Sequence, residues 1–252
     1  MPTRELVHYA VDRGIARIEL DSPHNRNALS RQLVEELSAH LATAGADESV
    51  RAVELTHTGK VFCAGADLSE AVNGPATMPV IHLLRRILET PKPVVARLHG
   101  HVRAGGLGII GAADVVFAAP AVTFAFTEVL IGLAPAMITL TTAGRMTERS
   151  YSRYLLSGET FDSPAAAEAG LITAAVDDLD GTVEAYFDQL RRCSPQGLAE
   201  TKAVTTRVTL AAFDERAEDL AAMSARLFAT EEAKEGMRSF LEKRTPSWVI
   251  DA

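Results

Sequence analysis

In this chain of 252 residues, two loops rich in small residues give the clearest indication of a reactive site. They are Phe62-Cys63-Ala64-Gly65-Ala66-Asp67-Leu68 and Gly100-His101-Val102-Arg103-Ala104-Gly105-Gly106-Leu107-Gly108, and each follows a β-branched hydrophobic run. Because glycine and alanine leave backbone N–H groups open to a ligand, two such groups from separate loops can hold a developing oxyanion. Glycine-rich turns between a strand and a helix also bind phosphates or simply allow tight packing, and a purely structural role is an equal alternative for the second loop.

Glu128 is the side chain best suited to proton transfer. It lies in Phe124-Ala125-Phe126-Thr127-Glu128-Val129, a mostly apolar stretch in which an unpaired carboxylate is costly. Burial of that kind raises the pKa of a carboxyl group toward the range useful for general acid–base catalysis. A surface or salt-bridged glutamate is the ordinary alternative.

Composition limits the classes of partner. The chain is 47% hydrophobic, which suffices for a large core, and its net charge of -8 argues against a nucleic-acid-binding protein. Cys63 and Cys193 are the only cysteines, so we expect no disulfide framework and a cytoplasmic protein. The first residues lack the apolar core of a signal peptide, and no apolar run reaches about 18 residues, so no membrane span is expected. The histidines show no H-E-x-x-H pattern, and no metal site is predicted.

The elements that must position these residues follow from hydrophobic periodicity. Strands are predicted at 7–10 and 15–20 around the turn Asp12-Arg13-Gly14, and at 52–56, 94–98, 114–118 and 172–176. Helices are predicted from the N-cap Ser30 to Gly45, at 81–88 and at 105–112, whereas 69–76 is loop-like.

After Thr147 the pattern is almost wholly helical. The predicted helices cover 151–157, 178–192, 196–208, 213–228 and 231–243. Strands followed by glycine and helix favour the α/β class, with a mixed or parallel sheet covered by helices. We expect residues 1–195 to form the core and residues 196–252 a helical region of the same structural unit, because no linker separates them.

The order and spacing of several motifs resemble the crotonase, or enoyl-CoA hydratase/isomerase, superfamily over nearly the whole chain. The resemblance implies a crotonase-like spiral core of (ββα) units with a C-terminal helical trimerisation region. The motifs are Asn25-Arg26-Asn27-Ala28-Leu29, the two loops above with Asp114, Phe124-Ala125-Phe126-Thr127-Glu128 with Gly132-Leu133-Ala134-Pro135, Gly158-Glu159-Thr160-Phe161 before Ala169-Gly170-Leu171, and the terminal Glu235-Gly236-Met237-Arg238-Ser239-Phe240-Leu241-Glu242-Lys243-Arg244.

By this resemblance, the backbone N–H groups of Ala66 and Gly105 bind the thioester oxygen of an acyl-CoA, and Glu128 is the acid–base group. The resemblance also implies contacts to the substrate or its coenzyme A part from Arg26, Ala28, Ala64, Asp67, Leu68, Phe240 and Lys243. Phe240 and Lys243 would reach the coenzyme A of a neighbouring subunit, in a homotrimer or dimer of trimers. Helix packing and an exposed chain end are equal alternatives for these two. Coenzyme A is then part of the substrate, and no separate cofactor is expected.

Gly108 departs from the two-glutamate hydratases of the family, which have their other catalytic glutamate at this position. Glycine cannot hold a water molecule or transfer a proton. The combination of Gly108 with Glu128 is similar to single-glutamate hydratases of the methylglutaconyl-CoA type, so hydration of a 2-enoyl-CoA, branched or dicarboxylic, is the favoured expectation. Double-bond isomerisation with Glu128 as the proton shuttle, and a catalytically silent acyl-CoA-binding or assembly subunit, stay open. Thioester hydrolysis ranks last because Gly132-Leu133-Ala134-Pro135-Ala136 lacks the expected aspartate.

Other polar side chains are weaker candidates for the acyl pocket. Arg103, with His101 beside it, could meet a substrate carboxylate. His82 and Arg85, three residues apart on a predicted helix, share a face and could border the acyl chain. Loop filling, subunit contacts and a solvated helix face are the ordinary alternatives.

Overall fold

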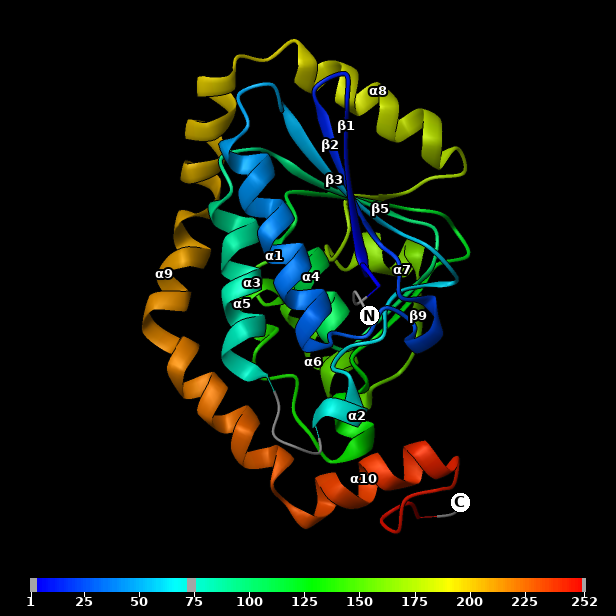
Figure 1. The fold of residues 1–252 in the computed structure, drawn as a ribbon. Coiled ribbons are helices and arrows are strands. Elements are labelled where there is room, and N and C mark those ends of the chain that lie inside the picture. The colour runs from blue at the N-terminus through cyan, green and yellow to red at the C-terminus, as the bar shows by residue number, and fades with distance from the viewer. Residues whose placement is uncertain (1–3, 72–75, 251–252) are drawn as a thin grey trace.

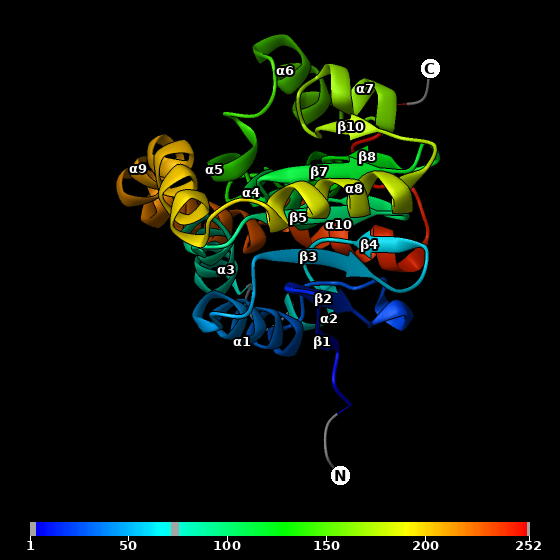
Figure 2. The same ribbon diagram turned by 90° about the horizontal axis from the view of Figure 1, so that it is seen from above.

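The computed structural model describes residues 4–71 and 76–250, and within this part the strands form two sheets (Figure 1). The larger sheet has the order β1-β2-β3-β5-β7-β10, in which β1 is antiparallel to β2 and the other neighbours are parallel. Figure 2 shows these strands succeeding one another across the sheet. Their bounds are β1 (Val7–Asp12), β2 (Ile15–Leu20), β3 (Ala52–His57), β5 (Val94–Leu98), β7 (Val115–Ala118) and β10 (Ala174–Ala175).

The smaller sheet has the order β4-β6-β8-β9 and was not predicted. Its strands are β4 (Val61–Cys63), β6 (His101–Arg103), β8 (Thr123–Ala125) and β9 (Phe161–Asp162). Strand β6 lies inside the second stretch expected to be a loop, and β4 overlaps the start of the first. They were missed because three residues are too few to show a strand alternation. Since β4, β6 and β8 follow β3, β5 and β7 along the chain, the backbone passes repeatedly from the large sheet to the small one. This alternation is the spiral (ββα) core that the resemblance implied.

Helices cover both faces of the large sheet. The predicted N-cap is confirmed, because the Ser30 side chain accepts a hydrogen bond from the Leu33 N–H, and α1 ends one residue after Gly45. The expected loop at 69–76 is partly wrong, since α2 extends to Ala71; residues 72–75 lie outside the described part. The helices of the core are α1 (Arg31–Ala46), α2 (Leu68–Ala71), α3 (Thr77–Glu89), α4 (Gly105–Ala112), α5 (Thr139–Thr142), α6 (Glu148–Ser157), α7 (Ser163–Glu168) and α8 (Leu179–Arg191), with 3-10 helices η1 (Pro23–Asn25) and η2 (Thr127–Ile131).

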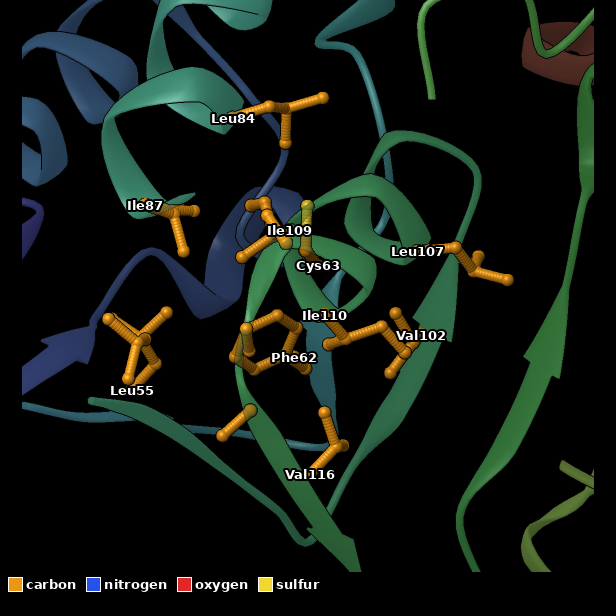
Figure 3. Close-up of a cluster of buried hydrophobic side chains, with 14 of the residues drawn as sticks. Leu55, Phe62, Cys63, Leu84, Ile87, Val102, Leu107, Ile109, Ile110 and Val116 are labelled. Atoms are coloured by element: carbon orange, nitrogen blue, oxygen red, sulfur yellow. The ribbon is translucent and has the colours of Figure 1, made fainter. Parts of the chain in front are cut away.

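The main hydrophobic cluster lies between the two sheets and the helices α1, α3 and α4. Figure 3 shows part of it, with Phe62 of β4 beside Ile110 of α4 and Val102 of β6. A second cluster fills the space between the other face of the large sheet and α8. The small sheet is thereby packed against α4, whose first residue is Gly105.

The C-terminal region contains one long helix where two were predicted. Residues 196–208 and 213–228 belong to a single helix, α9 (Pro195–Phe228), because the four residues between them include no glycine or proline. Lys202 ties α9 to the core through Asp114, at 2.8 Å, and through the carbonyl of Ile87. A further helix, α10 (Glu231–Glu242), packs against η2 of the same chain. None of the described helices combines the length and apolar character needed to cross a membrane.

Candidate active site

The first loop is fixed by the segment that contains the Asn25–Leu29 motif. Leu29 N–H donates to the Gly65 carbonyl at 2.7 Å, and Ala64 N–H donates to the Arg26 carbonyl at 3.1 Å. Gly65 has a φ of +89°, which glycine adopts without strain. Ala66, the next residue, forms an isolated parallel bridge with Leu29. The short strand β4 therefore ends in a loop that a neighbouring backbone segment holds in place.

The second loop approaches the first at the start of α4. A Cβ atom on Gly65 would lie 2.6 Å from the Ala104 Cβ and 3.2 Å from the Gly105 nitrogen, so the loops touch. Ala104 has the strained backbone angles φ 46° and ψ −123°, which turn the chain from β6 into α4. Among the described residues, the backbone N–H groups of Ala66 and Gly105 form no hydrogen bond. The two predicted oxyanion donors thus lie on adjoining loops with their hydrogen-bonding capacity unused.

Glu128 lies in η2, directly after β8. The residue is half-buried, but its Oε2 atom is enclosed and has no hydrogen-bond partner in the described part of the chain. Burial raises the pKa of this carboxyl to about 7, although a hydrogen bond from its own N–H opposes the shift. The expected apolar surroundings are present, since Phe126 is fully buried and packs its ring against those of Phe161 and Tyr151. Glu128 can therefore exchange a proton near neutral pH.

Gly108 stands where two-glutamate hydratases have their other catalytic glutamate, and the structure shows which side chains lie beside it. It lies one helical turn after Gly105 on α4, so a side chain here would extend from the same helix face. A Cβ atom would lie 2.6 Å from Ile138 Cγ2 and 3.3 Å from Leu84 Cδ1. The space beside Gly108 is filled by apolar side chains. Ile138 was not singled out in the sequence, because only the packing of α5 on α4 brings it to Gly108.

The residues expected to contact coenzyme A surround the first loop. Asp67 accepts hydrogen bonds from Asn25 Nδ2 at 3.0 Å and from the Ser69 N–H, so its carboxylate joins η1 to the start of α2. Ala28 is buried, Ala64 is half-buried, and Arg26 is exposed.

The remaining expected contacts involve the C-terminal helix. Leu68 packs against the small cluster formed by Leu133 and Met237, where α10 meets the core. Phe240 is 53% exposed, and Lys243 is an exposed residue that follows α10 in a left-handed conformation. The exposure of Phe240 argues against helix packing, its ordinary alternative, whereas the exposure of Lys243 fits both a coenzyme A contact and an exposed chain end.

The polar candidates for the acyl pocket have partners or face solvent. Arg103 is on strand β6, not in a loop, and its guanidinium donates to the Thr123 carbonyl at 2.6 Å and to Thr123 Oγ1 at 2.8 Å. His101 Nδ1 also contacts Thr123, at 3.0 Å. Arg85 pairs with Asp214 of α9 and lines a surface cavity of about 610 Å³ between α3 and α9. His82 is exposed on α3.

Known proteins are similar to this chain in both fold and sequence. A sequence profile described as Enoyl-CoA hydratase/isomerase matches residues 10–250. The crystal structure of an enoyl-CoA hydratase from Mycobacterium avium is 48% identical with a TM-score of 0.92, and the match covers 98% of this chain and 100% of that chain. A carnitinyl-CoA hydratase from Mycobacterium avium is 27% identical with a TM-score of 0.87, covering 98% and 99%. The mitochondrial enoyl-CoA hydratase of Pongo abelii is 28% identical over 242 residues, covering 91% of this chain and 82% of that protein. The chain therefore belongs to the enoyl-CoA hydratase/isomerase, or crotonase, family and is an enzyme of that family.

Proposed function

We propose that this enzyme hydrates a 2-enoyl-CoA with Glu128 as its single acid–base group. The observation that carries the proposal is the Glu128 carboxyl, whose Oε2 is enclosed without a partner among the described residues and whose pKa is about 7. Such a group accepts and returns a proton at neutral pH. The likeness to the Mycobacterium avium enoyl-CoA hydratase over the whole chain supports hydration as the reaction.

The proposed reaction uses the two loops and Glu128 in sequence. The Glu128 carboxylate takes a proton from water while the water oxygen bonds to C3, and the electrons of the double bond move onto the thioester oxygen. The N–H groups of Ala66 and Gly105 donate hydrogen bonds to that oxygen, which carries the negative charge of the enolate. The protonated Glu128 then gives its proton to C2, and the thioester carbonyl reforms. Because one carboxyl serves both steps, the hydrogen and hydroxyl add to the same face of the double bond.

For the acyl group, we propose a branched or dicarboxylic 2-enoyl chain of the methylglutaconyl type. The space beside Gly108 holds Ile138 and Leu84 instead of a second acid, so Glu128 alone positions water there. A carboxylate on the substrate would supply a second hydrogen-bond acceptor for that water. This is the reason for preferring a dicarboxylic chain over an unsubstituted one.

The test measures the activity of the purified enzyme on matched substrates. Loss of the conjugated enoyl-thioester absorbance is followed with a branched dicarboxylic 2-enoyl-CoA, the same branched chain without the terminal carboxyl, and crotonyl-CoA. We expect the highest kcat/KM for the dicarboxylic substrate. Glu128→Gln should lower kcat/KM by about 10² to 10⁴, whereas Glu148→Gln, at an exposed glutamate on α6, should leave it unchanged. Absence of turnover with every substrate would instead favour a silent acyl-CoA-binding subunit.

Isomerisation is the second candidate, and the apolar filling beside Gly108 favours it. Moving a double bond requires one base and no activated water, so Ile138 and Leu84 would be no obstacle. Glu128 would take a proton from C2 of a 3-enoyl-CoA and return it to C4. A gain of conjugated absorbance from a 3-enoyl-CoA, faster than the loss from any 2-enoyl-CoA, would identify this activity.

We also propose that the enzyme is a homotrimer or a dimer of trimers. In that assembly, the exposed Phe240 and Lys243 would contact the coenzyme A bound by a neighbouring subunit. Substituting both with alanine should raise the KM for the acyl-CoA without changing kcat. A sizing measurement that finds only monomer would remove this role.

A further inference from the structure

Gly108 and Ile138 compete for one volume in the interior of the protein. The Cβ position of residue 108 lies 2.6 Å from Ile138 Cγ2, closer than real Cβ atoms approach, and 3.1 Å from Ile138 Cβ, which is a tight contact. Ile138 is 2% exposed and Leu84 is fully buried, so neither side chain has free space to move into. A side chain at 108 and the isoleucine at 138 therefore exclude each other.

The position of Ile138 is fixed by the contact between α4 and α5. Thr141 Oγ1 donates a hydrogen bond to the Gly108 carbonyl at 2.9 Å, and Thr142 Oγ1 donates to the Ile138 carbonyl at 2.8 Å. Gly111 adds to the close approach, since a Cβ atom there would lie 2.9 Å from the Thr141 carbonyl oxygen. The two helices hold Ile138 against the same face of α4 that begins with Gly105.

We propose that Ile138 is a specificity-determining residue of the acyl-CoA site. It occupies the volume that a carboxyl-bearing side chain at 108 would need, and so keeps the site in its form with one carboxyl group. The atoms nearest to the 108 side-chain position are the aliphatic carbons of Ile138 and Leu84, which cannot orient water. The consequence is selection against unsubstituted 2-enoyl chains, which bring no acceptor of their own. This inference rests on the proposed hydration with Glu128.

The test enlarges the side chain at position 108 and removes the one at position 138. Gly108→Glu alone should destabilise the protein, because the new side chain meets Ile138. Gly108→Glu combined with Ile138→Gly should recover a large part of that loss and place a second carboxyl on the face of α4 that carries Gly105. Relative to Gly108→Gln with Ile138→Gly, the variant with Gly108→Glu and Ile138→Gly should hydrate crotonyl-CoA about a hundredfold faster, the lower end of the usual contribution of one acid–base group. Its pH profile should also gain a second ionisation, which a purely structural change would not produce.

The outcomes separate the inference from the proposed function. A folded double variant with no gain on crotonyl-CoA over its glutamine control would overturn the inference. If the double variant does not fold, Gly108→Ala is compared with the variant that also carries Ile138→Ala. If Ile138→Ala does not restore the unfolding temperature lost through Gly108→Ala, the inference is equally overturned. If the wild-type enzyme hydrates none of the three 2-enoyl-CoA substrates, the proposed function is wrong. The unfolding measurements on the variants would still show whether side chains at positions 108 and 138 exclude each other.

Discussion

Replacing Glu128 with glutamine should inactivate the enzyme and stabilise it at the same time. The Glu128 carboxyl has a pKa of about 7 in the folded chain, against an ordinary value of 4.5. Between these pH values the unfolded chain has lost its proton and the folded chain has kept it, so the free energy of unfolding falls as pH rises through the window. At roughly 1.4 kcal/mol for each pKa unit, the ionised carboxyl costs the fold about 3 kcal/mol above pH 7. Glutamine resembles the neutral carboxyl and avoids this cost.

The assay is denaturant unfolding of wild type and Glu128→Gln at two pH values. At pH near 4.5 both side chains are neutral in the folded protein, and the two free energies of unfolding should agree. Above pH 8 the variant should be more stable by about 3 kcal/mol. Its kcat/KM should fall by about 10² to 10⁴, the usual contribution of one acid–base group. Wild-type kcat/KM should rise with pH through about 7, because the carboxylate must accept the first proton.

Two results would refute the reasoning. If Glu128→Gln is no more stable than wild type above pH 8, the carboxyl is not an enclosed and unpaired charge. If the variant keeps near-normal rates, Glu128 is not the acid–base group. Glu148→Gln serves as the control, because the exposed Glu148 should alter neither the stability difference nor the rate.

The remaining predictions concern the fold around the site. Burial lowers the pKa of His57 to about 4, so the protein should lose up to about 3 kcal/mol of stability as pH falls from 6.5 to 4, and a thermal unfolding series with His57→Phe should flatten this slope. Gly65→Ala should lower the unfolding free energy by about 1 to 3 kcal/mol and reduce kcat, because φ is +89° and the new Cβ meets Ala104; an unchanged kcat would argue against the loop contact. Lys202→Met should cost about 3 kcal/mol by leaving Asp114 without its buried partner, and adding Asp114→Asn should recover part of it in the same denaturant assay.

The large sheet could be predicted because its signals are local. The hairpin turn at Arg13 and Gly14 has the positive φ angles that a two-residue connection requires, and the flanking β-prone runs became β1 and β2. Ser30 capped α1 as expected, since a cap involves only residues three apart. These elements depend on neighbours in the sequence.

The small sheet could not be predicted from periodicity, because its order depends on distant partners. Val61 pairs with His101, and Phe124 pairs with Phe161, in strands of two or three residues. The first three of these short strands form where the chain returns to the small sheet after β3, β5 and β7. Their sequences carry too few residues for an alternating pattern to appear.

The candidate site was predictable in part. The apolar neighbours of Glu128 correctly indicated a buried carboxyl with a raised pKa. The Gly65 loop contacts the Gly105 loop, as expected if the N–H groups of Ala66 and Gly105 act together. Only the family resemblance named these two groups, because loop composition alone left tight packing as an equal explanation. The filling of the space beside Gly108 by Ile138 had no sequence signal, because it arises from the packing of α5 on α4. This contact joins residues that are distant in the sequence, so no local sequence pattern indicates it.

The contact of α10 with η2 has a consequence for how the protein is made. Gly132 lies so close to the backbone of Glu232 that a Cβ atom would be 2.8 Å from its carbonyl carbon, and Gly236 approaches Ile131 in the same way. The segment that carries Glu128 is thus completed by a helix that is synthesised well after it. Contacts between such distant parts of a chain form late in folding. A nascent chain released before residue 231 would therefore hold both loops but lack the support of its acid–base segment.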